Sequence, residues 1–345
     1  MSQLTGRKRE ADRIRRANRA AAVGNLMLGK LNSWEKFLEP DIVDLEKLPR
    51  RQLKSGVSDI NERLLPEIEE FCRRNFHDMD VQKLSLLYEE IKEFRGIESP
   101  LKEFEKKYGK IRREVLKGNP NHLTLSISLW GLKFQFPEDE ITKDILTALD
   151  IVVQSQDQIK NYKGVSHRKL EANINHIASL MRQEKFSSRS IVLSCFNLIE
   201  AYLNGLAWDY LEKTDLRKLS NTKQKLLKDT NQTPIRDKLR KYPAVIAGKE
   251  LWEDNDQLLE SFIDTIKPFR DSLVHPSPFS APLNFGGYDK LRLFYRVDYD
   301  TALMSVDIVV KIIKRIHAHV YSSETTLPKW IQDLEFGINQ NTSKE

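Results

Sequence analysis

The sequence predicts a mainly helical, all-α protein, and three observations lead to this prediction. Glycine and proline are sparse, at 14 and 13 of 345 residues, which favours long helices over a strand-rich fold. Apolar residues recur three or four positions apart through most of the chain, as they do on one face of a helix. Many of these stretches begin near Ser or Asp and stop at or near Gly, Pro or His, which is typical of helix ends.

Residues 1–33 form the first predicted segment, a basic helical arm. The arm holds eight Lys and Arg residues against two acidic ones, so it accounts for the whole formal net charge of +6. Arg9, Arg13 and Arg16 share one ridge and are candidate contacts for a nucleic-acid backbone. The apolar face consists mostly of small residues, so we expect it to be a weak core former. A solvated helical extension and a segment that docks in an acidic groove of a partner are the open alternatives.

Residues 34–180 are predicted to be a helical N-terminal region with a sensor or regulatory role. Amphipathic helices are expected over residues 55–76, 78–96, 99–120, 137–162 and 165–185. Residues 123–136 alternate apolar and polar side chains instead, which predicts one possible short strand pair.

Residues 185–322 are predicted to form a helical bundle around one central helix. Residues 187–213 are apolar almost all round, as expected for a helix in the middle of a domain. Asn197, Glu200 and Asn204 interrupt this pattern as one polar stripe, at spacings of three and four. A buried carboxylate is costly without a cation, so the stripe predicts an Arg partner from another helix.

The remaining elements complete this bundle. Further helices are expected over residues 219–230, 233–246, 255–276 and 298–322. Residues 276–297 are rich in Pro, Gly and aromatic side chains, which predicts a loop that ends in a short strand-like piece. Residues 323–345 are predicted to be a C-terminal tail that is disordered after Leu334.

The stretch "PFRDSLVHPSPF" places Arg270 and His275 at the end of one predicted helix. Residues five apart on an ideal helix point about 140° away from each other. Pro276, however, disfavours the α conformation for His275, so the imidazole is expected at or past the helix end, where it can turn back towards Arg270. The pair is either a catalytic device or structural, with Arg270 neutralising Glu200 and His275 capping its helix.

Residues 185–322, about 40% of the chain, resemble a HEPN domain, the higher eukaryotes and prokaryotes nucleotide-binding fold. The resemblance rests on the helix order, on "RDSLVH" near the end of the third main helix, and on "CFNLIEAYLN" in the apolar first helix. It implies a bundle of four or five helices that cleaves RNA without a metal or other cofactor, in a cleft formed across a homodimer.

The same resemblance implies roles for individual residues. His275 would take the proton of the RNA 2′-OH or protonate the leaving 5′-oxygen. Arg270 would stabilise the charge that builds on the phosphorane. The expected products carry a 2′,3′-cyclic phosphate and a 5′-OH. The residues expected to support this chemistry are Asp271, Glu200, Asn197 and Asn204.

The function hypothesis is therefore a prokaryotic defence or toxin endoribonuclease, with an antitoxin or regulatory protein as a further possible partner. The alternative is a non-catalytic, dimeric scaffold that binds RNA or protein. The chain's two cysteines lie inside apolar helical patterns, which predicts neither a disulfide framework nor a zinc site and favours a cytoplasmic setting. No membrane span is predicted, because no uninterrupted apolar run approaches the roughly 18 residues required.

Overall fold

The computed structural model describes residues 6–27, 50–128, 131–162, 164–228, 233–276, 289–321 and 326–342. Helices account for 76% of the structure, and one small three-stranded antiparallel sheet accompanies them. The mainly helical prediction is therefore confirmed. The chain divides into two compact units, Met1–Phe136 and Pro137–Glu345.

This division differs from the segments that the sequence suggested. The helix of the basic arm, α1 (Gly6–Met27), packs within the first unit and is not a separate extension. The boundary expected between the N-terminal region and the helical bundle, at residues 180–185, falls inside one continuous helix, α9 (Ile174–Lys213). Residues 174–186 contain neither Gly nor Pro, so nothing in them ends the helix that continues into the apolar core segment.

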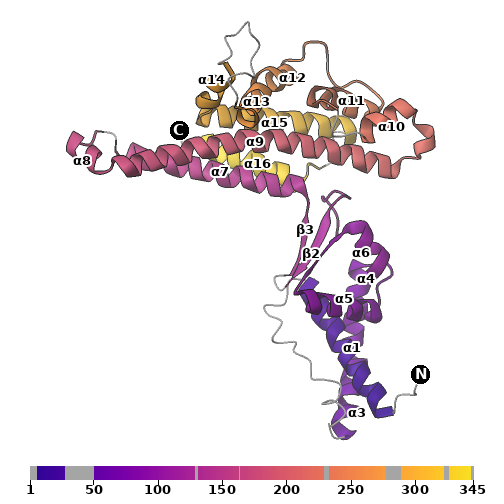
Figure 1. Cartoon of the computed structure of the whole chain (residues 1–345). Coiled ribbons are helices and arrows are strands. Elements are labelled where there is room, and N and C mark those ends of the chain that lie inside the picture. The colour runs from indigo at the N-terminus through magenta and orange to yellow at the C-terminus, as the bar shows by residue number, and fades with distance from the viewer. Residues whose placement is uncertain are drawn as a thin grey trace. The chain divides into compact units, whose positions relative to one another are not determined.

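The first unit combines its helices with the sheet (Figure 1). The sheet has the order β1-β2-β3, and all its pairs are antiparallel. Its strands are β1 (Ile97–Pro100), β2 (Thr124–Ser128) and β3 (Gly131–Gln135). The helical elements are α1, α3 (Arg50–Asp59), the π-helical η2 (Ile60–Leu64), α4 (Leu65–Asn75), α5 (Val81–Phe94) and α6 (Leu101–Tyr108). The strand pair expected over residues 123–136 is confirmed as β2 and β3, and β1 adds a strand that was not predicted.

Helix α1 is a core element of the first unit, contrary to the expectation from its small apolar residues. Ala11, Ala17, Ala20 and Val23 are at most 1% exposed. Its main neighbour is α5, and it also contacts α3, α4 and the sheet. Small side chains let two helix backbones approach closely, so this face packs tightly although each residue contributes little area.

The helix expected over residues 99–120 ends early, at Tyr108, because Gly109 turns the chain. Gly109 has a φ of 127°, in the region that favours glycine. A Cβ atom at this position would lie 2.9 Å from the backbone nitrogen of Met79. Both the dihedral angle and the close approach therefore require glycine.

Gly109→Ala is expected to lower the free energy of unfolding of the first unit by about 2 kcal/mol or more, because backbone strain and a clash with main-chain atoms act together. Gly118→Ala is the matched control. Gly118 also has a positive φ, of 85°, but a Cβ there meets no atom within 4 Å. Urea unfolding of the two variants measures the difference, and equal losses would show that the Met79 contact has no energetic weight.

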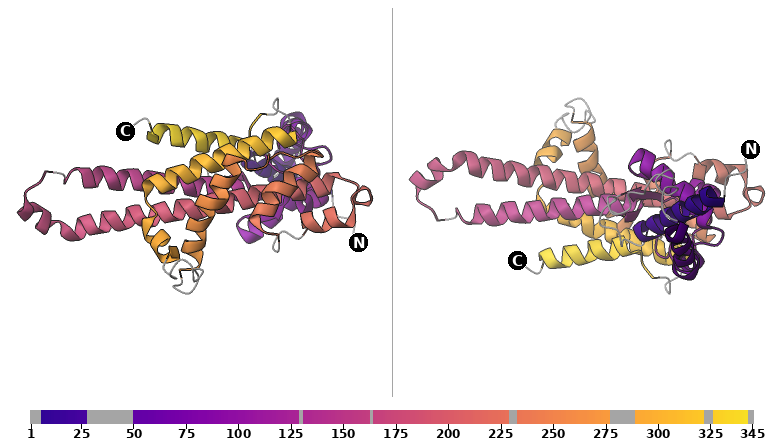
Figure 2. Two further views of the ribbon diagram at one scale, coloured as in Figure 1. Left: turned by 90° about the horizontal axis from the view of Figure 1, so that it is seen from above. Right: turned by 90° about the horizontal axis from the view of Figure 1, so that it is seen from below.

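The second unit is a helical bundle in which α9 contacts α7, α15, α11, α13 and α10 (Figures 1 and 2). Helices α7 (Pro137–Lys160) and α9 form a long hairpin with α8 (His167–Ala172) at its tip. The other elements are η3 (Leu216–Lys218), α10 (Asn221–Lys228), α11 (Ile235–Ala247), α12 (Gln257–Glu260), the π-helical η4 (Ser261–Ile266), α13 (Lys267–Val274), α14 (Asp289–Arg296), α15 (Tyr299–Tyr321) and α16 (Lys329–Thr342).

Two predictions about the C-terminal part were wrong. The piece expected to be strand-like is the helix α14, while residues 277–288 of the expected loop lie outside the described residues. The tail expected to be disordered after Leu334 contains α16. Trp330, Ile331 and Leu334 are buried, and α16 packs on α7 and α15, so an apolar face docks this helix on the second unit.

By length and composition alone, α9 could also cross a membrane, although no span was predicted from the sequence. Most of its apolar window is buried inside the second unit, however. A core helix of a globular domain meets the same criteria, so this helix is weak evidence about a membrane in either direction.

Candidate functional site

A proline sets the local structure before the Arg270–His275 segment. Pro268 lacks an N–H group, and its ring in a helix would clash with the carbonyl of Asp264, four residues earlier. The π-helical η4 covers that position and ends two residues before Pro268. The described part of the chain has one other π-helical segment, η2, which ends two residues before Pro66. The wider π turn accommodates the proline, so the chain continues as a helix into α13.

Arg270 is held in place on α13 by an acidic and an aromatic neighbour. Its Nη1 donates to Oδ1 of Asp271 at 2.9 Å, and its guanidinium carbon lies 4.2 Å from the ring centroid of Phe196 on α9. Phe196 in turn stacks on Phe262 of η4, with the ring centroids 5.8 Å apart. The Arg270 side chain is 28% exposed. The guanidinium is therefore ordered on the core but still accessible to solvent.

His275 ends α13 with a non-helical backbone, as the following proline predicted. Its φ and ψ are −125° and 66°, and its backbone N–H donates to the carbonyl of Asp271 at 2.9 Å. The residue is exposed. An imidazole at this position can reach a substrate from the end of the helix.

The structure gives Asp271 two cationic partners. Lys267 Nζ lies 2.6 Å from its Oδ2, and Arg270 binds its other oxygen. Burial raises the pKa of Asp271, but the hydrogen bonds and charges of Lys267 and Arg270 outweigh it, so the pKa is lowered. Asp271 is therefore ionised near neutral pH and binds the guanidinium of Arg270.

The ion pairs of Asp271 stabilise the folded protein by an amount that depends on pH. Because the pKa of Asp271 is lowered in the folded protein, its stabilising effect is present above the ordinary value of 3.8 and is lost as the pH falls through the lowered value. Asp271→Asn is expected to cost about 1 kcal/mol of unfolding free energy at pH 7 and much less at pH 3. Urea unfolding of both proteins at the two pH values measures this. A cost that stays the same at pH 3 would contradict the ion pairs.

Glu200 does not have the Arg partner that was expected. Lys238 of α11 binds it, with Nζ 2.7 Å from Oε1. The Lys238 side chain is only 1% exposed, whereas that of Glu200 is 37% exposed. Lys238 follows the apolar face of α11 with Ile235, Leu239 and Tyr242, all buried. A lysine at a core position was the sequence signal for this pair, and it was missed.

The other two residues of the polar stripe are in different environments. Asn197 is exposed, beside the Phe196 that Arg270 covers. The Oδ1 atom of Asn204 is buried and has no hydrogen-bond partner among the described residues. Asn197 is thus the solvent-exposed member of the stripe.

Helices α11 and α13 meet α9 one turn apart. Arg270 contacts α9 at Phe196 and Lys238 contacts it at Glu200, so the two contacts are separated by about 6 Å along the helix axis. The structure therefore brings the segment of α11 close to the motif, although the two are far apart in the sequence.

Residues 213–241, from the end of α9 into α11, form a strongly basic segment. They contain ten Lys and Arg residues against three Asp, a local excess hidden by the neutral balance of the chain after residue 33. Asp215 pairs with Arg217 and Asp237 with Lys241. Exposed cations of this segment include Lys218, Lys223, Lys225, Lys228 and Arg236. Such a surface attracts a polyanion.

The three arginines of the basic arm lie on α1 in the first unit. Arg9, Arg13 and Arg16 are all exposed. Arg13 Nη2 donates to Oδ1 of Asn61 at 2.6 Å, and Arg16 pairs with Asp12 at 2.7 Å. They remain candidates for contact with nucleic acid, but Arg13 and Arg16 also bind side chains of their own unit, and Arg9 is not free of interactions either.

Comparison with known proteins does not assign the chain to a family or to a function. No protein-family model matches the chain, and neither a curated protein nor a solved structure matches it. The functional interpretation therefore depends on the geometry of the chain itself.

Proposed function

We propose that the second unit is a HEPN-like endoribonuclease that cleaves RNA without a metal ion, in a defence or toxin role. This proposal rests mainly on the arrangement of side chains at the end of α13. An exposed His275 with a non-helical backbone follows Arg270, whose guanidinium is fixed by Asp271 and Phe196. A general acid or base and a fixed cation at one accessible helix end are the groups that phosphoryl transfer needs.

In the proposed reaction the 2′-oxygen of RNA attacks the adjacent phosphorus. One histidine takes the 2′-OH proton, and the bond between phosphorus and the 5′-oxygen breaks as a second histidine protonates that oxygen. Arg270 stabilises the added negative charge on the phosphorane with its planar fork of N–H donors. Because each chain supplies one His275, a homodimer would provide both the base and the acid in one composite site.

The basic segment at residues 213–241 supports RNA as the substrate. Its exposed Lys and Arg side chains can bind several phosphates, and one of them, Arg236, lies on α11, the helix that meets α9 one turn from the Arg270 contact. Contacts of this kind hold the sugar–phosphate backbone of the RNA in place without recognising its base sequence. The arginines of α1 are a second candidate contact in this proposal.

Incubation of the purified protein with RNA in excess EDTA tests the proposal. We expect cleavage products with 2′,3′-cyclic phosphate and 5′-OH ends, because the 2′-oxygen is the nucleophile. Products with 5′-phosphate ends, or cleavage that EDTA abolishes, would contradict it.

The second candidate is a non-catalytic scaffold that binds RNA or a protein partner as a dimer. One observation favours it: Arg270 already has a carboxylate partner and an aromatic ring, so it could serve the fold alone. This alternative expects the protein to retard RNA in a gel while the RNA stays intact under every condition in which the fold is retained.

A further inference from the structure

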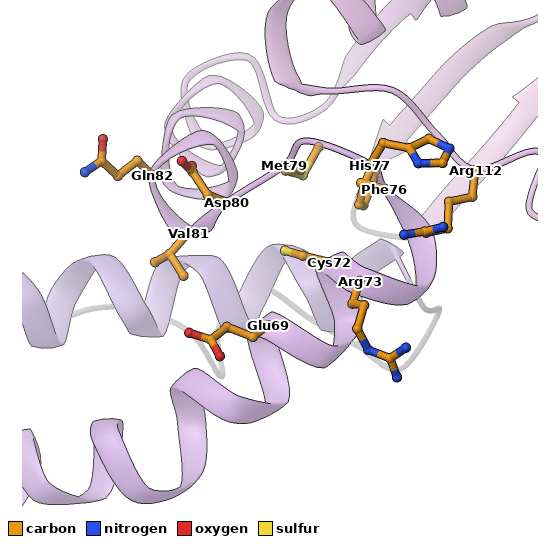
Figure 3. A pocket seen from close by; sticks show the side chains of 10 residues that line it. All are labelled: Glu69, Cys72, Arg73, Phe76, His77, Met79, Asp80, Val81, Gln82 and Arg112. Carbon is orange, nitrogen blue, oxygen red and sulfur yellow. The ribbon is translucent and has the colours of Figure 1, made fainter.

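The first unit contains a hollow of about 520 Å³ between the end of α4, the start of α5 and the segment after α6 (Figure 3). Its volume lies within the range of pockets that bind small molecules. It is lined by Glu69, Cys72, Arg73, Phe76, His77, Met79, Asp80, Val81, Gln82 and Arg112. No residue of this hollow belongs to the proposed nuclease site, so the proposal below does not rest on the proposed function.

The backbone fixes the cationic side of this hollow. The His77 N–H donates to the carbonyl of Lys110 at 2.9 Å, and the Arg112 N–H donates to the carbonyl of Asn75 at 2.9 Å. Phe76 and Ile111 form the bridge between these two bonds. The two short antiparallel segments therefore hold the His77 and Arg112 side chains on one side of the hollow (Figure 3).

Of the two arginines that line the hollow, Arg112 is the one with no carboxylate partner among the described residues. Its Nε is buried and has no hydrogen-bond partner among the described residues. Arg73 differs, because Glu70 binds its guanidinium at 2.6 and 2.7 Å. Figure 3 shows the end of the Arg112 guanidinium directed towards Cys72, so its outer nitrogens can donate to an anion in the hollow while Nε stays buried behind them.

The opposite side of the hollow is acidic. Figure 3 shows Glu69 and Asp80 across from Arg112 and His77, with Cys72 between the two sides. Both residues are exposed, and Asp80 already accepts the N–H of Lys83 as the N-cap of α5, at 2.8 Å. This side accepts hydrogen bonds and repels negative charge.

The floor between the two sides is apolar. Cys72, Phe76 and Met79 are buried, at 8%, 2% and 5% exposure. Burial, together with the charges of Asp80 and Glu69, raises the pKa of Cys72 to about 11, so the thiol stays protonated at neutral pH and is not a nucleophile. The hollow is therefore suited to binding and not to thiol chemistry.

We propose that this hollow binds a nucleoside monophosphate. One phosphate would lie against Arg112 and His77, the base would cover the apolar floor, and hydroxyl or amino groups would donate to Glu69. A bare phosphate would leave the floor uncovered. A triphosphate would bring additional negative charge towards Glu69 and Asp80, so a single phosphate fits this charge distribution best.

Isothermal titration calorimetry of the full-length protein with AMP, adenosine, inorganic phosphate and ATP tests the proposal. We expect AMP to bind at least about tenfold more tightly than each of the other three probes, since each of those loses a contact or gains repulsion. Absence of AMP binding at millimolar concentration, or equal binding of adenosine and AMP, would overturn it.

Substitutions of two neighbouring arginines assign the binding to this hollow. Arg112→Gln is expected to weaken AMP binding at least about tenfold, because it removes a charge-assisted contact. Arg113→Gln is the matched control, since Arg113 is exposed and lies outside the hollow. If Arg112→Gln does not fold, Arg112→Lys replaces it, and a smaller loss is expected because the charge remains. Equal effects at positions 112 and 113, or none at 112, would refute the site.

Discussion

Replacement of His275 by Ala is expected to reduce the rate of RNA cleavage by about 10²–10⁴-fold, the usual contribution of general acid–base catalysis. His275 is exposed at the end of α13, so its loss should leave the melting temperature of the protein nearly unchanged. His176→Ala is the matched control, because His176 is an exposed histidine near the start of α9, about 30 Å along the helix axis from Phe196. Rates are measured under single-turnover conditions.

Arg270→Ala tests the same site, and we expect it to lower the rate of RNA cleavage by about 10²–10³-fold. Arg270 also covers Phe196 and binds Asp271, so its removal can affect the fold, and the melting temperature must be measured alongside the rate. Arg270→Lys keeps the charge but loses the planar fork, and an intermediate rate is expected. Arg182→Ala, at an exposed position of α9, is the control.

Normal cleavage by His275→Ala would exclude the proposed chemistry. Loss of activity in Arg270→Ala alone, with a matching loss of stability, would assign Arg270 to the fold and favour the scaffold alternative.

The second large effect concerns stability, at the pair of Lys238 and Glu200. Glu200→Gln is expected to lower the free energy of unfolding by about 2–3 kcal/mol, because it leaves the buried ammonium of Lys238 without its carboxylate. Lys238→Met is expected to cost about 1 kcal/mol or less. Methionine fills the volume of the lysine stem, and the half-exposed Glu200 can be hydrated instead.

The double variant Glu200→Gln/Lys238→Met separates the pair from its surroundings. We expect it to be more stable than Glu200→Gln alone, since the uncompensated charge is gone. Urea unfolding of the wild type and all three variants gives the comparison. Two results would contradict this account. In one, Lys238→Met lowers the free energy of unfolding more than Glu200→Gln does. In the other, the effects of the two single substitutions simply add in the double variant, so that the buried charge of Lys238 would not explain the cost of Glu200→Gln.

Much of the fold could be predicted from periodicity, and the exceptions have physical causes. The hairpin of β2 and β3 and the apolar segment 187–213 have strong local patterns, so sequence alone located them, although it placed a boundary inside the longer helix α9. The strand β1 has four residues, and α16 has three buried apolar side chains, so both depend on contacts with distant segments. No local pattern of that length distinguishes a docked element from a loop or tail.

The candidate site was also only partly predictable, because some of its features depend on local sequence and others on contacts between distant segments. Pro276 governs the backbone of His275 locally, and the sequence therefore predicted that His275 departs from the helix. The partner of Glu200 depends on which helix packs against α9, and the sequence suggested an Arg where the structure has Lys238. The hollow of the first unit joins residues 69–82 with Arg112, and that contact arises only when Phe76 pairs with Ile111.

The most direct test of the proposed function uses an RNA oligonucleotide in which one nucleotide, at a mapped cleavage position, lacks its 2′-OH. With the nucleophile removed, we expect cleavage to disappear at that position and to continue at unmodified positions of the same strand. Cleavage that persists at the deoxy position would contradict attack by the 2′-oxygen, and with it the roles assigned to His275 and Arg270.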